Sequence, residues 1–140
     1  DGKLTFVSEA RVKYWDPTPN DNEIRFFTKD FDFGLPGVKK KIYKVYVSYR
    51  GTDAALVSFR YAVNGEKNES DTYNFNPAAT PLANQSDETL WHVAELKPNV
   101  ASEANGIYSI RLYVGATGVP IDKSFMINDI SIVYRTKNIK

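Results

Sequence analysis

The sequence predicts an all-β domain, an antiparallel β-sandwich of the jelly-roll type, and three observations support this. Val, Ile, Thr and the aromatic residues, which favour a pleated and half-buried surface, make up about a third of the 140 residues. Apolar and polar residues mostly alternate with a period of two. Turn residues separate about eight short segments of this kind, which is typical of packed antiparallel sheets. Residues 1–140 are therefore expected to form a single β-sandwich domain.

The first third of the chain has the least regular pattern. Short strands are expected at residues 4–7, 12–15 and 24–27, with a loop at 16–23 before the third. The acidic residues of this loop are hard oxygen ligands of the kind that Ca²⁺ prefers. Two prolines stiffen the loop, however, and the Asp-x-Asp-x-Asp-Gly pattern is missing, so a solvated loop is expected and no metal site is assigned.

The middle of the chain carries the clearest strands. Residues 42–50 and 56–63 both alternate, and the turn residues between them predict that the two strands form a hairpin. Asn64-Gly65 predicts a tight turn with positive φ, because both residue types tolerate the left-handed region. A shorter strand is expected at 71–75, and residues 76–88 are expected to form a long loop.

The last strands are expected at 90–96, 107–114 and 125–135. The alternation changes phase at Asn128-Asp129, which predicts a β-bulge there. Continued through all the strands, the alternation predicts which aromatic residues face the core: Tyr43, Tyr49, Phe59, Tyr61, Tyr108 and Tyr134.

Composition excludes several kinds of function. The chain has no cysteine, which excludes disulfides, thiolate metal sites and cysteine nucleophiles. The net charge of +1 gives no global attraction to nucleic acid, and no apolar run is long enough to span a membrane. The single histidine, His92, alternates into a strand beside Trp91 and is expected to pack on the sheet rather than to catalyse. We expect neither an enzyme nor a cofactor.

A set of Tyr and Arg residues forms the candidate binding face. Tyr and Arg are enriched where protein surfaces bind partners. If their strands share a sheet, these residues lie together on one face; the alternative is an ordinary solvated face on which Arg stems cover their neighbours. They lie on three of the expected strands, opposite the core phase: Tyr46, Arg50, Arg60, Arg111 and Tyr113.

Two stretches of the sequence carry a family resemblance. One runs from Phe27 to Tyr49 and contains Phe-Asp-Phe-Gly-Leu-Pro-Gly-Val-Lys-Lys-Lys; the other is the ending Phe125 to Lys140. Both resemble the C-terminal β-rich domain of structural proteins in tailed bacteriophage particles, particularly those of marine phages. The resemblance covers residues 27–140 and implies a virion component that forms the end of a longer polypeptide, which fits a chain beginning with Asp1.

Two functions follow as hypotheses. The first is a structural module of a phage particle, from its tail or capsid, that binds other virion proteins or copies of itself through its sheet face and strand edges. The alternative is a carbohydrate-binding module, which attaches to a host-surface glycan or belongs to a secreted glycosidase. This alternative predicts a row of exposed aromatic residues, with four candidates: Trp15, Tyr46, Trp91 and Tyr113. Fold alone does not choose between them.

Overall fold

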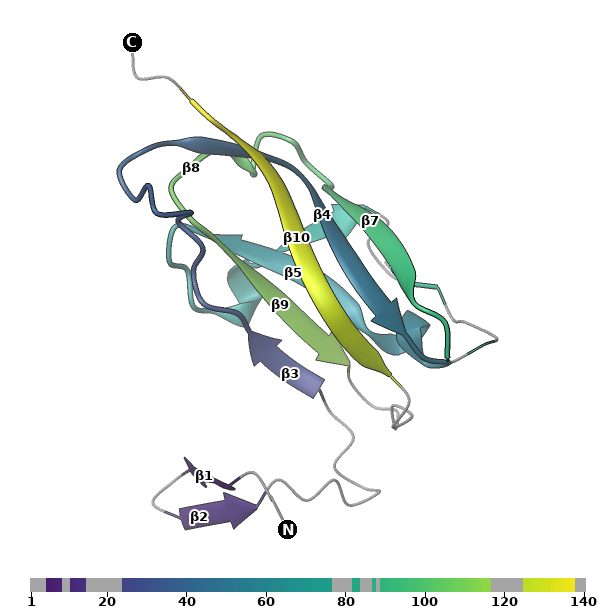
Figure 1. Cartoon of the computed structure of the whole chain (residues 1–140). Coiled ribbons are helices and arrows are strands. Elements are labelled where there is room, and N and C mark those ends of the chain that lie inside the picture. Colours follow the sequence, from purple (N-terminus) through teal and green to yellow (C-terminus); the bar gives the residue numbers. More distant parts are fainter. Residues whose placement is uncertain are drawn as a thin grey trace.

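The structure, a computed structural model, is almost entirely built from β-strands (Figure 1). Every strand pairing in the described part of the chain is antiparallel, and its helices are two short 3-10 turns. The prediction of an all-β antiparallel fold is confirmed. No helix among the described residues has the length and hydropathy needed to cross a membrane. The described residues are 5–8, 11–14, 24–76, 82–83, 87, 89–116 and 125–137.

Strands β1 and β2 pair only with each other, whereas the other strands form one continuous sheet in the order β10-β4-β7-β6-β5-β9-β3, with β8 beside β4. The 3-10 turns are η1 (Ala54–Leu56) and η2 (Glu69–Asp71). The strands are β1 (Thr5–Ser8), β2 (Arg11–Tyr14), β3 (Ile24–Phe27), β4 (Lys40–Arg50), β5 (Ser58–Val63), β6 (Tyr73–Asn76), β7 (His92–Pro98), β8 (Asn105–Ile107), β9 (Ile110–Ala116) and β10 (Met126–Thr136).

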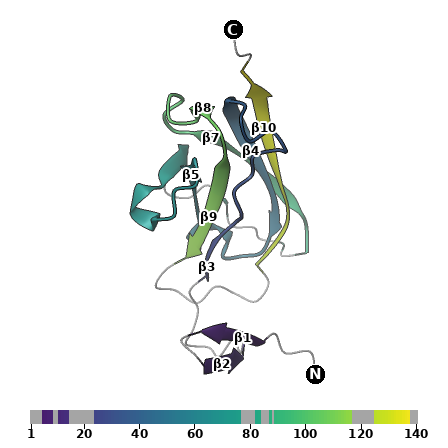
Figure 2. The same cartoon turned by 90° about the vertical axis from the view of Figure 1, so that its left-hand side faces the viewer.

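The sheet curls, so that β10, β4 and β7 form one layer and β5, β9 and β3 form a second layer across from it (Figures 1 and 2). The side chains between the layers form one apolar core, and burying each large one stabilises the fold by about 1.5–3 kcal/mol. Because one hydrogen-bonded path joins the layers, the two-sheet sandwich with jelly-roll topology stays a prediction. The core includes Val45, Val47 and Tyr49 of β4, Phe59 and Tyr61 of β5, and Ile110, Leu112 and Val114 of β9.

The predicted hairpin between residues 42–50 and 56–63 is wrong. Strand β4 pairs with β10, β7 and β8, whereas β5 pairs with β6 and β9. The connection passes through η1, where Ala54 and the following Val57 are fully buried and carry the chain from one layer to the other. Gly51 begins this crossing with φ of 123°, and a Cβ there would lie 2.6 Å from the backbone of Phe125.

Three of the predicted core tyrosines, Tyr43, Tyr108 and Tyr134, are exposed. Tyr43 is an extra residue in β4, because Ile42 and Lys44 face the consecutive residues Tyr134 and Val133 of β10. The bulge changes the phase of β4 and turns the Tyr43 ring outward. Tyr108 lies between β8 and β9, where the expected single strand is interrupted. Tyr134 stacks on Phe33, with 3.9 Å between ring centres, outside the core.

Two local predictions are confirmed. Asn64 and Gly65 have φ of 56° and 81°, as a tight turn requires. Ile127 faces Tyr49 and Asp129 faces Ser48, which leaves Asn128 as the extra residue of a bulge in β10. Three of the aromatic residues assigned to the core by the alternation are indeed buried: Tyr49, Phe59 and Tyr61.

Candidate functional site

The structure divides the candidate binding face into two groups. Tyr46 and Arg50 lie on β4, whereas Arg60 lies on β5, and Arg111 and Tyr113 lie on β9. These strands belong to opposite layers and turn their apolar residues toward the same core. Their outward residues therefore face away from each other, and the predicted single face is not formed.

On the outer face of β3, β9 and β5, four side chains form what we call the arginine–aromatic stack: Phe27, Arg60, Arg111 and Tyr113. The Arg60 guanidinium lies 4.4 Å from the centre of the Tyr113 ring. The Tyr113 and Phe27 rings are 5.0 Å apart, and the Arg111 guanidinium lies 5.3 Å from the Phe27 ring. Cation–π and tilted aromatic contacts of this kind are mutually attractive.

Tyr113 is buried within this stack, with only 2% of its surface exposed. Its prediction as an exposed binding residue is therefore wrong, because Phe27 of the neighbouring strand β3 and Arg60 cover its ring. Gly115 provides the space below the ring, since a Cβ at that position would lie 2.5 Å from the Tyr113 hydroxyl oxygen. The period of two correctly predicts that Tyr113 points to the outer face. It does not predict that Phe27 and Arg60 cover the ring there.

The charges of the stack are paired within the protein. Arg60 contacts Glu69 at 2.6 Å, and Arg111 contacts Asp30 at 3.2 Å. The Tyr113 hydroxyl also donates to Glu69, and these two hydrogen bonds lower the pKa of the Glu69 carboxyl. Burial raises the pKa of Tyr113. Both arginines of the stack are thus paired with carboxylates of the same chain.

On the outer face of β10, β4 and β7, Tyr46 is held in an ionic network. The Tyr46 hydroxyl and the Lys44 ammonium each donate to the same Glu95 oxygen at 2.8 Å, and Lys97 contacts the other oxygen at 3.0 Å. Hydrogen bonds from Lys44, then Tyr46 and Lys97, lower the pKa of Glu95 to about 2. Tyr46 is half-buried, and the Lys44 ammonium lies 5.4 Å from the centre of its ring.

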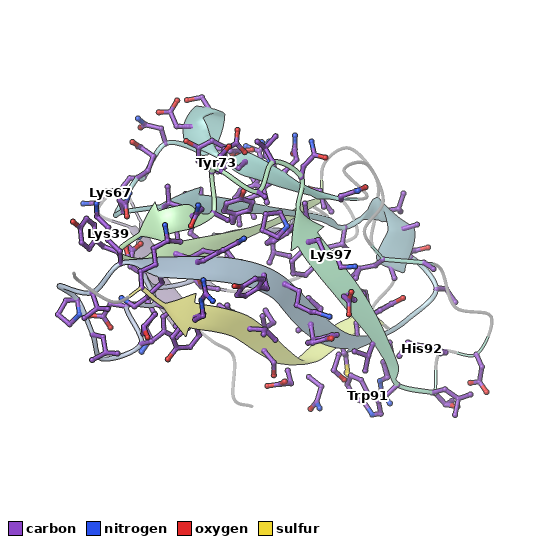
Figure 3. All side chains as sticks on the ribbon, turned by 90° about the horizontal axis from the view of Figure 1, so that it is seen from above. Lys39, Lys67, Tyr73, Trp91, His92 and Lys97 are labelled. Atoms are coloured by element: carbon purple, nitrogen blue, oxygen red, sulfur yellow. The ribbon has the colours of Figure 1, made fainter. Side chains whose placement is uncertain are left out.

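The same face carries a group that we call the Trp91 patch: the half-buried Arg50 and the exposed Trp91, Val93 and Met126. The Arg50 guanidinium lies 4.9 Å from the Trp91 ring and 3.2 Å from the Met126 sulfur. Trp91 is 46% exposed and Val93 is 68% exposed. Figure 3 shows Trp91 at the start of β7, at the opposite end of the molecule from Lys39 and Lys67. Apart from Arg50 and Trp91, the sequence did not single out these residues.

The remaining sequence candidates contribute no site among the described residues. His92 is half-buried, with its ring 6.2 Å from that of Tyr49. Trp15 and the acidic loop at 16–23 lie outside the described residues. The described part of the chain contains no group of three or more His, Cys, Asp or Glu residues able to hold a metal ion. Of the aromatic residues that the sequence singled out for carbohydrate binding, Trp91 is exposed, Tyr46 is half-buried and Tyr113 is buried.

Comparisons of the chain with protein-family models, with curated proteins and with solved structures find no match. The resemblance of residues 27–140 to phage structural proteins therefore stays a prediction.

Proposed function

We propose that the chain is a non-enzymatic structural module of a tailed-phage particle, where it pairs with a second copy of itself along the edge of β10. The particle setting rests on the sequence resemblance of residues 27–140. The self-pairing rests on one observation, which is the long open edge of β10.

Strand β10 is 11 residues long and stands at one end of the sheet. Among the described strands it pairs only with β4, so its other edge offers backbone donors and acceptors to a further strand. Proteins usually protect such an edge with charges, bulges or a covering segment. In β10 the bulge at Asn128 leaves a run from Asp129 to Thr136 in which no residue is skipped.

The charges along this run are self-complementary. Asp129 and Arg135 are both exposed and lie three residues on either side of Ile132. If two β10 strands pair antiparallel about a two-fold axis at Ile132, each Asp129 lies opposite the Arg135 of the other copy. Opposite charges across a strand pair are stabilising and like charges are destabilising, so the two residues select this register. A two-fold dimer is also the commonest symmetric assembly.

The pairing is expected to be weak in solution. An edge-to-edge contact buries less than the roughly 1,200–2,000 Å² of a standard stable interface. In a particle, where many copies are held close together, the effective concentration is high and a weak contact is sufficient.

Sedimentation velocity over a range of concentrations tests the self-pairing. We expect a reversible monomer–dimer equilibrium that Arg135→Glu abolishes, because each Asp129 then faces a glutamate. The double variant Asp129→Lys, Arg135→Glu restores the charge pairs and should restore the dimer. Lys67→Glu, an exposed change on the Asn64–Gly65 side of the molecule, is the matched control and should leave the dimer unchanged.

A wild-type chain that stays monomeric at every concentration would overturn the self-pairing, as would a dimer that Arg135→Glu does not weaken. The particle setting is tested separately by the genes that flank the coding sequence. Portal, terminase or tail genes beside it support the setting, and flanking genes of an unrelated process contradict it.

A further inference from the structure

A shallow, open pocket of about 320 Å³, lined by polar and apolar surface in similar amounts, lies near Lys39, at the end of the molecule away from the Trp91 patch (Figure 3). Three segments of the chain form it: the turn before β4, the β5–β6 turn and the link between β8 and β9. Its size lies at the lower end of the roughly 300–1,000 Å³ range of small-molecule sites. The side chains that define its chemistry are Asp30, Asp32, Asn64, Tyr108 and Ser109.

The fully buried Lys40 ties two of these segments together. Its ammonium group donates to the carbonyl oxygens of Leu35 at 2.5 Å, Val38 at 2.8 Å and Tyr108 at 2.8 Å. A buried charge is costly unless its hydrogen bonds are satisfied, and here each of the three ammonium protons has an acceptor. Lys40 therefore holds the turn before β4 in a constant position relative to Tyr108.

Asn64 joins the third segment, the β5–β6 turn, to the link between β8 and β9. Its side-chain oxygen accepts a hydrogen bond from the Tyr108 backbone at 2.7 Å, and its own backbone donates to Ser109 at 3.0 Å. Phe31, which stands between the two aspartates, exchanges backbone hydrogen bonds with Ile110 at 2.8 and 3.2 Å. All three walls are thus held before any ligand arrives, which lowers the entropic cost of binding.

The pocket combines acceptors, donors and an aromatic ring. Asp30 accepts a hydrogen bond from the Ser109 hydroxyl at 3.4 Å, and Asp32 accepts one from the Gly34 backbone at 2.9 Å. Each carboxylate has acceptor capacity beyond this one bond, and the Asn64 amide can donate. Tyr108 is 43% exposed and offers an aromatic surface beside them. The hydroxyls of a sugar both donate and accept hydrogen bonds, and the apolar C–H face of a sugar ring packs on an aromatic ring.

The charges nearby favour a neutral ligand over a cation. Arg111 pairs with Asp30 at 3.2 Å, and the Lys39 ammonium already lies 5.8 Å from the centre of the Tyr108 ring. A ligand ammonium group would meet these cations in addition to Lys40. We infer that the pocket between Asp32, Asn64 and Tyr108 binds a neutral carbohydrate, one or two sugar rings in size. This inference does not depend on the self-pairing of β10.

Chemical-shift mapping of the ¹⁵N-labelled chain tests the inference. The probes are glucose, galactose, mannose and N-acetylglucosamine at millimolar concentration, followed by a glycan array. We expect shifts concentrated at residues 30–36, 64–65 and 108–109. Tyr108→Ala and Asp32→Asn should each weaken binding about tenfold or more. Tyr43→Ala, which removes a tyrosine of similar exposure (38%) from the β4 bulge, is the matched control and should bind as the wild type does.

Three results would overturn the inference. The first is the absence of shifts and of array binding for every sugar. The second is binding that Tyr108→Ala leaves unchanged while the amide spectrum shows a folded chain. The third is a response to choline, a compact organic cation, without a response to the sugars, because this would assign the pocket to cationic ligands.

Discussion

The two outer faces of the curled sheet use the same residue types with opposite results. On the β3-β9-β5 face, arginines and aromatic rings are stacked, paired with carboxylates and covered, so that Tyr113 is buried. On the β10-β4-β7 face, Arg50 also lies on an aromatic ring, but Trp91 and Val93 remain exposed. The difference comes from neighbouring segments: β3 supplies Phe27 as a cover, and η2 supplies Glu69 as a counter-charge. An arginine beside an aromatic ring therefore does not by itself indicate a binding site. The segment that packs on the ring and the carboxylate that pairs with the arginine also have to be known.

The largest effect on stability is expected from removing Tyr113, which lies buried at the centre of the β3-β9-β5 face. Tyr113→Ala should lower the free energy of unfolding by about 3–5 kcal/mol, because it deletes a buried aromatic ring from under Arg60. Trp91→Ala, on the open face, should change it by about 1 kcal/mol or less, since the ring is half exposed. Urea unfolding of both variants measures the contrast. Equal losses in the two variants would show that the faces do not differ as described.

A smaller loss of stability is expected from adding an atom in the space below the Tyr113 ring. Gly115→Ala places a methyl group 2.5 Å from the Tyr113 hydroxyl oxygen, so the ring has to move. We expect a loss of about 1–3 kcal/mol in the free energy of unfolding, typical of an overpacked site. Thermal unfolding measures this loss, and the double variant Gly115→Ala, Tyr113→Leu serves as the control because the shorter side chain relieves the clash. An additive loss in the double variant would contradict the contact.

The smallest expected effect is a pH dependence of stability that comes from Glu95 on the β10-β4-β7 face. The pKa of Glu95 is about 2 in the folded chain, below its ordinary value of 4.5. The ion pairs of Glu95 therefore stabilise the fold fully above about pH 4.5, and this stabilisation is lost as the pH falls through about 2. Carboxyl NMR titration measures the pKa directly. Lys44→Met should raise it further toward 4.5 than Tyr46→Phe does, because the hydrogen bond from Lys44 is the largest cause.

The salt dependence of the Glu95 pKa is a second test of this ionic network. Because Glu95, Lys44 and Lys97 lie near the surface, added salt should screen their attraction and raise the pKa of Glu95. A pKa that stays low in high salt and in Lys44→Met would mean that another group holds the carboxylate.

The local features of the chain followed from its sequence. The period of two predicted the strands, since side chains alternate between the two sides of any strand whatever its partners. Asn64-Gly65 predicted its turn because the requirement for positive φ lies within two residues. The phase change at Asn128 predicted its bulge for a similar reason, because the faces of β10 are readable along the strand itself.

Only the tertiary structure determined which segments pack on each face of the sheet, and therefore which side chains are buried. The direction of Tyr113 followed from alternation, but its burial required Phe27 from β3 and Glu69 from η2, which are distant in the sequence. The exposure of Tyr43 required a bulge defined by its pairing with β10, and the separation of β4 from β5 required the buried crossing at Ala54. Alternation specifies which side of a strand a residue occupies. Which segment covers that side is set by long-range packing, and this packing separates a structural arginine from one that is available to a partner.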